Sequence, residues 1–319
     1  MKAFIITRME IRKDYFLERY VYLAGDRKIR PKQFKKKENV EEGICYFCPG
    51  NERLTPPEIG RIGTKDKWSI RWFPNKFAAV ELKGQPEFKS KTFYKHANAY
   101  GKHEIIAETS NHKHQIWDLS EKHVEQLLYV YKNRITSLSK LKNIKYVLIF
   151  KNHGRQGGTS LVHSHSQVTA LSKIPTEVVE KVESIKKYKS CAYCKIIDNE
   201  KKSKRKCFEN KTFVAFAPYA PRFNYEIWIF PKRHVKKIED LSNEEYSDWA
   251  SILKKILVKL KELDASFNYY IHYSPNKSDL HLQMCICPRI ANWAGFELGS
   301  GEIINSVYPE DAAKFYNEK

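Results

Sequence analysis

The sequence predicts an α+β protein built from two copies of one unit, with two antiparallel sheets and helices packed on them. Two observations lead to this prediction: a segment that recurs along the chain, and a Cys-x-x-Cys pair that opens each copy. The 319 residues have room for two domains or for one doubled domain. A hydrophobic content of 42% is enough for a buried core.

The recurring segment aligns residues 104–120 with residues 226–242 at a constant shift of 122, without gaps. Seven of the 17 aligned positions are identical, among them His112 with His234 and the Asp-Leu-Ser that ends each segment. In each copy an apolar run, which we predict as a strand, leads to the histidine. Ser120 and Ser242 then suit the N-cap of a helix.

The pattern after each serine continues in the same order in both copies. We predict helices over about 121–139 and 243–263, because a long helical pattern follows the cap. The β-rich runs 146–150 and 269–273 come next, and each is followed by a further histidine, His163 or His281. We therefore divide the chain into residues 1–172 and residues 173–319, with Pro175 and the charged stretch 181–189 in the connecting region.

Each copy contains two cysteines and two histidines with the chemistry of zinc ligands. Tetrahedral zinc is satisfied by two thiolates and two imidazoles, and ligands from distant points of a chain contribute folding energy. We predict two zinc ions per chain. The alternatives are reduced thiols beside core histidines, and a redox dithiol. The predicted ligands are Cys45, Cys48, His112 and His163 in the first copy, and Cys191, Cys194, His234 and His281 in the second.

The two copies differ where chemistry is expected. The first reads His163-Ser164-His165-Ser166-Gln167, and the second reads His281-Leu282-Gln283-Met284-Cys285. On a strand, residues two apart share a face, so His165 and Gln167 would lie beside a metal-bound histidine. A free imidazole can attack phosphorus, and an amide N–H can stabilise a phosphoryl oxygen. The first copy is therefore the predicted catalytic half, and the second the structural half.

A glycine-rich segment precedes this pair of histidines. Residues 151–160 follow a predicted strand, and their glycines allow backbone N–H groups to approach a phosphate closely. The alternative is an ordinary glycine-rich hairpin beside two core histidines. The other five histidines in the repeat region, His103, His114, His123, His153 and His272, have no counterpart in the other copy, and we expect them to be ordinary surface or core residues.

The charge and hydropathy of the chain limit its partners. A formal net charge of +20 favours anionic partners, which are nucleic acids, membrane surfaces or small phosphorylated substrates. No stretch approaches the roughly 20 apolar residues of a membrane span. The N-terminus lacks the apolar core of a signal peptide, so we expect a cytoplasmic protein without a membrane partner.

At these residues the sequence resembles the galactose-1-phosphate uridylyltransferase family of the histidine-triad superfamily, especially its ADP-glucose phosphorylase branch. The matching motifs run from Arg27-Lys28-Ile29-Arg30-Pro31 to Gly295-Phe296-Glu297-Leu298-Gly299 and cover nearly the whole chain. The resemblance implies a duplicated histidine-triad-like fold. It also implies that His165 is the nucleophile and Gln167 its phosphate-oxygen partner.

The resemblance assigns further residues to substrate. The residues it implies for binding the nucleotide and its phosphates are Arg27, Arg30, Asn75, Asn152, Gly158 and Ser160. Phe296 and Glu297 match a segment that reaches the sugar from the partner subunit of a homodimer. The implied metal ligands are the eight residues named above.

The implied activity is nucleotidyl transfer through a nucleotidyl-histidine, with ping-pong kinetics. We expect UDP-glucose as donor and a hexose 1-phosphate, galactose 1-phosphate, as acceptor. Ser164 stands where many family members have Pro, which leaves the acceptor open and keeps an ADP-glucose phosphorylase as the alternative. A nucleotide hydrolase and a zinc-ordered nucleic-acid-binding protein also fit parts of the pattern. The nucleic-acid-binding protein gives no role to His165 and Gln167, so we do not expect a nucleic-acid partner.

Overall fold

The computed structural model describes residues 9–25 and 43–318. Arg27 and Arg30, which the family resemblance assigns to nucleotide binding, lie outside these residues. Among the described helices, none combines the length and the hydropathy that a membrane span needs.

The strands and helices follow one another in an order that repeats. In the first half they are β3 (Gly60–Gly63), β4 (Trp68–Pro74), β5 (Lys89–Lys91), β6 (Tyr94–His96), β7 (Gly101–Ala107), α1 (Glu121–Leu138), β8 (Tyr146–His153) and β9 (His165–Leu171). After them come α2 (Thr176–Ile185), α3 (Ala192–Glu200), β10 (Lys206–Glu209), β11 (Phe213–Phe216), β12 (Ile227–Pro231), α4 (Asn243–Glu262), β13 (Phe267–His272) and β14 (Gln283–Pro288). The remaining elements are β1 (Glu10–Lys13), β2 (Tyr20–Leu23), α5 (Gly295–Ser300), β15 (Ile303–Asn305) and α6 (Pro309–Asn317).

The α+β fold with a doubled unit is confirmed. The sheets of the two copies are continuous, because β8 pairs with β13 and joins them into one ten-stranded sheet. Its strand order is β10-β11-β12-β14-β13-β8-β9-β7-β4-β3, and each strand of one copy has its counterpart at the mirrored position of the other. Every pairing in this sheet is antiparallel.

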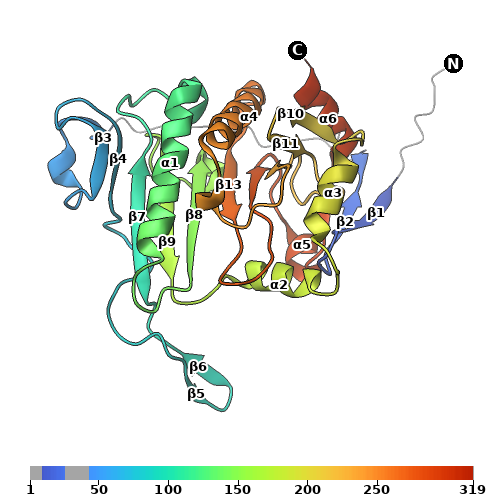
Figure 1. Ribbon diagram of the computed structural model, residues 1–319, viewed down its shortest axis with the longest axis horizontal. Helices are drawn as coiled ribbons and strands as arrows, with labels where there is room; N and C mark the ends of the chain where they lie inside the picture. The colour runs from blue at the N-terminus through green and yellow to red at the C-terminus, as the bar shows by residue number, and fades with distance from the viewer. Residues whose placement is uncertain (1–8, 26–42, 319) are drawn as a thin grey trace.

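The two long helices and their caps agree with the sequence predictions. The α1 and α4 helices begin directly after Ser120 and Ser242 and end within one residue of the predicted limits. Each serine hydroxyl accepts a hydrogen bond from a backbone N–H three residues later, and Ser242 also forms a capping box with Glu245. The helices lie side by side, with Tyr129 of α1 against Tyr246 of α4 (Figure 1).

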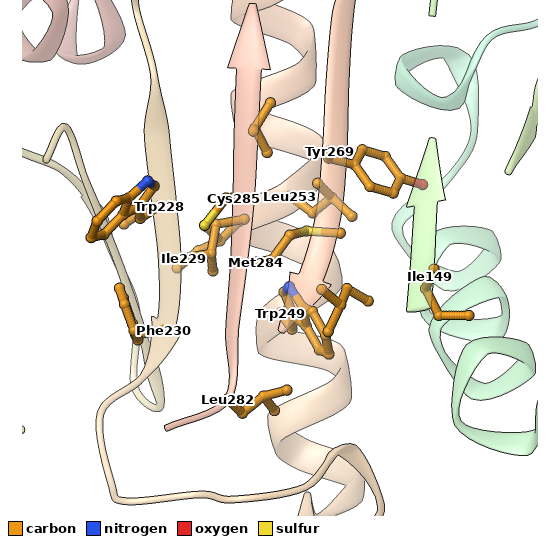
Figure 2. Close-up of a cluster of buried hydrophobic side chains, with 14 of the residues drawn as sticks. Ile149, Trp228, Ile229, Phe230, Trp249, Leu253, Tyr269, Leu282, Met284 and Cys285 are labelled. Carbon is orange, nitrogen blue, oxygen red and sulfur yellow. The ribbon is translucent and has the colours of Figure 1, made fainter. Parts of the chain in front are cut away.

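Alternation along the strands separates two faces of the sheet. Met284 and Tyr269 lie with Trp249 and Leu253 of α4 in a buried cluster (Figure 2). The alternate residues Trp228 and Phe230 of β12 contact α2 and α3 instead: the Lys181 Nζ lies 5.8 Å from the Trp228 ring, and the Tyr193 ring 5.7 Å from that of Phe230. Helices therefore cover both faces of the second half.

Two smaller sheets complete the described structure. Strand β2 pairs with β1 and, in parallel, with β15, so the N-terminal and C-terminal segments form one three-stranded sheet. The β5–β6 hairpin projects from the body (Figure 1), and its strand residues are all exposed. The division between residues 172 and 173 stays a prediction; it falls between the end of β9 and the start of α2.

A buried ion pair between α1 and β7 gives the first testable prediction. Arg134 donates two hydrogen bonds, of 2.8 and 3.0 Å, to the fully buried Glu104 carboxylate. We expect Arg134→Met to lower the free energy of unfolding by about 3 kcal/mol, because it leaves a buried charge without its main partner. Urea unfolding measures this.

Lys122→Met is the matched control on the same helix, because Lys122 forms only an exposed pair with Glu125 and should change stability by less than about 0.5 kcal/mol. Equal stability of Arg134→Met and Lys122→Met would contradict a stabilising role for the Arg134–Glu104 ion pair.

Candidate active site and metal centres

His165 stands at the first position of β9, with its imidazole held by the backbone. Its Nδ1 lies 2.8 Å from the His163 carbonyl oxygen, so Nδ1–H donates and Nε2 keeps its lone pair. Burial, together with the charge of Lys151, lowers the pKa of His165 to about 4. The ring is therefore neutral at pH 7, which is the form that a nucleophile requires.

A cavity of about 260 Å³ opens at this ring. It is lined by the end of β8, the glycine-rich segment and the start of β9, and it includes four residues that the sequence predicted: Asn152, Ser160, His163 and His165. Gly158 lies in the same segment with a φ of 82°, a conformation that favours glycine. The cavity can hold an anionic group beside a neutral imidazole.

His103 is a site residue that was not predicted from the sequence. Its Nδ1 accepts a hydrogen bond from the Ala79 N–H, so its Nε2–H donates to Gln167 Oε1 at 2.9 Å. This fixes the orientation of the Gln167 amide and leaves its NH₂ group free of that contact. Asn75, which the resemblance assigned to the nucleotide, lies next to this pair, with its Nδ2 3.4 Å from His103 Nε2. His103 has no counterpart in the repeat, so only the β7–β9 pairing could reveal its role.

A buried ion pair lies behind His165. The Lys151 ammonium donates to Glu108, to the Ser164 hydroxyl at 3.1 Å and to the His165 carbonyl at 3.0 Å. Ser164 also donates to Glu108 at 2.6 Å. Burial would raise the pKa of Glu108, but the Lys151 charge lowers it, so the carboxylate stays ionised. These bonds hold the backbone on both sides of the His165 side chain.

The first predicted metal centre brings all four residues together. The donor atoms of Cys45, Cys48, His112 and His163 lie within 4.8 Å of one another. The sulfur-to-nitrogen distances are 3.5 Å for Cys45–His163, 3.4 Å for Cys48–His112 and 3.6 Å for Cys48–His163. A tetrahedral zinc ion with Zn–S and Zn–N bonds of about 2.3 and 2.0 Å separates such ligands by about 3.5 Å. The donor set fits zinc.

This centre is connected to His165 through Phe47. Phe47 lies between the two cysteines, and its ring packs edge-on against that of His165 at 5.3 Å. His163 uses Nδ1 toward the sulfurs, and its Nε2 contacts the Thr109 carbonyl at 2.7 Å, which orients the ring as metal-binding histidines require. A metal here would fix both the loop that carries Phe47 and the start of β9.

The second centre brings three of its four predicted residues together. The donor atoms of Cys191, Cys194 and His234 lie within 4.8 Å of one another, with 3.6 Å from Cys194 Sγ to His234 Nδ1. His234 Nε2 contacts Asp279 at 3.2 Å. His281 is outside this group: its ring lies 5.1 Å from that of His234, and its Nδ1 contacts the Leu282 carbonyl. Its role as fourth ligand stays a prediction.

Phe296 and Glu297 lie elsewhere, on α5. The Phe296 side chain is 43% exposed and packs against Tyr22, and Glu297 accepts from the Ala294 N–H. Neither residue lines the cavity at His165. Their contact with a sugar stays a prediction.

The chain matches two protein-family descriptions. Residues 9–175 match "Galactose-1-phosphate uridyl transferase, N-terminal domain", and residues 105–315 match a domain of unknown function, DUF4921. The first match contains every residue of the cavity, and it covers slightly more than half of the chain.

Whole-chain relatives carry related names. An ADP-glucose phosphorylase of Arabidopsis thaliana is 34% identical over 97% of this chain and 92% of the relative. A galactose-1-phosphate uridylyltransferase of Thermotoga maritima is 26% identical over 97% and 98%. The crystal structure of an Arabidopsis thaliana ADP-glucose phosphorylase with bound ADP-glucose superposes with a TM-score of 0.85 and 30% identity, covering 98% of this chain and 99% of that one.

The metal centres give a testable prediction. We expect about two zinc ions per chain, and about one in Cys48→Ser, together with a lower unfolding midpoint. Burial and the neighbouring Cys45 thiol raise the pKa of Cys48 to about 11 in the metal-free site, so zinc binding displaces a proton and zinc affinity falls as the pH falls. Metal analysis after dialysis at several pH values measures both effects.

Cys207→Ser is the control, because Cys207 is buried outside both clusters and should keep the full zinc content. Full zinc content in Cys48→Ser would remove this residue from the site.

The tautomers of two histidines give a second prediction. With ¹⁵N-labelled histidine, NMR at pH 7 should show His165 protonated at Nδ1 and His103 protonated at Nε2, because a carbonyl and a backbone N–H fix them so. His165→Ala and His103→Ala assign the signals. A His165 ring protonated at Nε2 would have its lone pair on Nδ1, against the His163 carbonyl, and would contradict attack through Nε2.

Proposed function

This chain belongs to the galactose-1-phosphate uridylyltransferase family and is an enzyme of the nucleotidyltransferase type; from this premise we propose that it transfers a nucleoside monophosphate from a nucleoside diphosphate hexose by way of nucleotidyl-His165. The observation that supports this most is the neutral, backbone-held imidazole that lines the cavity beside Asn152 and the glycine-rich segment.

The proposed reaction has two displacements. His165 Nε2 attacks the α-phosphorus, a nitrogen–phosphorus bond forms, and the bond from that phosphorus to the bridging oxygen breaks, so that hexose 1-phosphate leaves with the electron pair. An oxygen of a second phosphate group then attacks the same phosphorus and releases His165. Each step exchanges one bond at phosphorus, and the imidazole returns to its starting form.

The surrounding groups supply position and charge stabilisation, which provide most of the catalysis in phosphoryl-type transfer. The Gln167 NH₂ group, oriented by His103, is the proposed donor to a phosphoryl oxygen. The glycine-rich segment and Ser160 offer N–H and O–H groups along the cavity. Zinc would contribute order rather than chemistry, through the Phe47 loop and His163. The net charge of +20 attracts polyanionic substrates.

Two donor and acceptor pairs fit this site. The sequence motifs favoured UDP-glucose with galactose 1-phosphate. The higher identity to the Arabidopsis ADP-glucose phosphorylase, 34% against 26% for the Thermotoga uridylyltransferase, favours ADP-glucose with inorganic phosphate. We therefore prefer ADP-glucose as donor and inorganic phosphate as acceptor. Release of ADP would identify the phosphorylase reaction, and release of a UDP-sugar the transferase reaction.

We also propose a cytoplasmic homodimer with two zinc ions per chain. The exposed position of Phe296 on α5, away from the cavity, supports a role in the site of a second subunit.

The intermediate provides the test. Incubation with ADP-glucose or UDP-glucose carrying ³²P in the nucleotide should leave acid-labile, base-stable label on the protein. We expect His165→Ala to abolish it and to lower turnover by a factor on the order of 10³ or more. His114→Ala is the matched control, because His114 is exposed and lies outside the cavity. Label on His165→Ala equal to that on the control would refute the proposed nucleophile.

A further inference from the structure

The glycine-rich segment of the first half rests on a strand of the second half. A Cβ atom on Gly154 would stand 2.3 Å from the Ser266 hydroxyl, and one on Gly157 would stand 2.8 Å from the Phe267 carbonyl oxygen. Neither position has room for a side chain, because the segment lies directly on residues 266–267 at the start of β13. The second half therefore supports the glycine-rich segment, part of which lines the cavity.

Asn268 connects this strand to the phosphate-facing residues. It stands opposite Asn152 in the β13–β8 pairing. Its Nδ2 donates to Asn152 Oδ1 at 2.9 Å and to the Gly157 carbonyl at 2.7 Å, and its Oδ1 accepts from Arg289 Nη1 at 3.1 Å. One side chain of the second half thus holds both a cavity residue and the backbone of the glycine-rich segment.

These partners fix the orientation of two amides. A guanidinium can only donate and a backbone carbonyl can only accept, so Arg289 and Gly157 determine which end of Asn268 carries the NH₂ group. Asn268 then donates a hydrogen bond to Asn152, and the side-chain carbonyl oxygen of Asn152 accepts it. The NH₂ group of Asn152 is left for another acceptor, and Asn152 lines the cavity at His165.

Arg289 is itself held in place. Its guanidinium carbon lies 5.4 Å from the centre of the Phe223 ring, and Phe223 stacks on Trp293 at 5.4 Å with an interplanar angle of 14°. Its backbone N–H donates to the Ser266 carbonyl. The Arg289 guanidinium is therefore held beside Asn268, and its hydrogen bond keeps the Asn268 side-chain oxygen directed away from Asn152.

We propose that Asn268, fixed by Arg289, is a positioning residue that directs the Asn152 NH₂ group toward a phosphate oxygen of the bound nucleotide. This inference rests on the proposed function. It gives the second half a part in substrate binding, although that half has Gln283 in place of His165.

The test compares two substitutions of Asn268 with opposite expected effects on binding and on stability. In Asn268→Asp the carboxylate pairs with Arg289 but cannot donate, so Asn152 turns and presents its carbonyl oxygen to the phosphate. In Asn268→Ala no partner selects either orientation. We expect the Kd for ADP and UDP to rise about thirtyfold in the first and about threefold in the second, because a hydrogen bond to a charged group is lost fully in one case and in part in the other.

Both variants lose the donor to the Gly157 carbonyl, but Asp keeps a charged partner for Arg289 and Ala does not, so we expect stability to follow the reverse order. Unfolding midpoints and the steady-state KM and kcat for the nucleotide sugar accompany the Kd values, and the main loss should appear in KM. A structural role alone would make binding and stability fall together, so that the less stable variant is also the weaker binder, and that result would overturn the proposal.

Two controls separate charge from orientation. Asn199→Asp adds the same charge at an exposed position of α3 and should bind ADP as the wild type does. In an Asn152→Ala background the difference between Asn268→Asp and Asn268→Ala should disappear; if it persists, the carboxylate acts directly on the nucleotide and the proposal fails. Unaltered labelling and binding in Asn268→Asp would reject this inference alone. A wild type that binds neither nucleotide and takes no label would reject the proposed function with it.

Discussion

The antiparallel pairing of β8 with β13 is the constraint on which the rest of the structure depends. Five residue pairs, from Phe267–His153 to Ile271–Ile149, join the two copies into one sheet. The pairing buries what would otherwise be two open sheet edges, which is a strong reason for the copies to remain together. It also places a strand of the second copy under the glycine-rich segment of the first. Support of that segment therefore follows from the duplication itself.

The same sheet shows how the two copies differ at the position of His165. In the second copy, Gln283 replaces His165 and Cys285 replaces Gln167, and both are almost completely buried. Helices α2 and α3 cover this face, with Tyr193 against Phe230 and the Lys181 Nζ 3.2 Å from His272 Nδ1. On the first copy, the corresponding face keeps a cavity at His165. The sequence difference between the copies therefore agrees with their packing: the face that has lost the histidine is covered by helices, and the face that keeps it has a cavity.

Local signals predicted a large part of this structure, and contacts between distant strands account for what they missed. The repeat, the serine caps and the two clusters of cysteine and histidine depend on short spacings or on register between copies, so the sequence alone indicates them. His103, 64 residues from its partner Gln167, and the Lys151–Glu108 pair, 43 residues apart, become visible only when strand register is known. Asn268 depends on the joining of the two sheets, which the repeat alone did not indicate, because two separate sheets would satisfy the same pattern.

The Lys151–Glu108 pair shows how stability and position are balanced here. Removing two charges from water costs several kcal/mol per ion, and apolar residues of similar volume often give the folded protein equal or greater stability. In this protein the lysine donates to the His165 carbonyl and to Ser164, so the ion pair holds the backbone at His165. Apolar replacements would fill the space but leave that carbonyl and hydroxyl without partners, which is itself costly. The buried Lys151–Glu108 pair is therefore better explained by how it positions the His165 backbone than by a gain in stability.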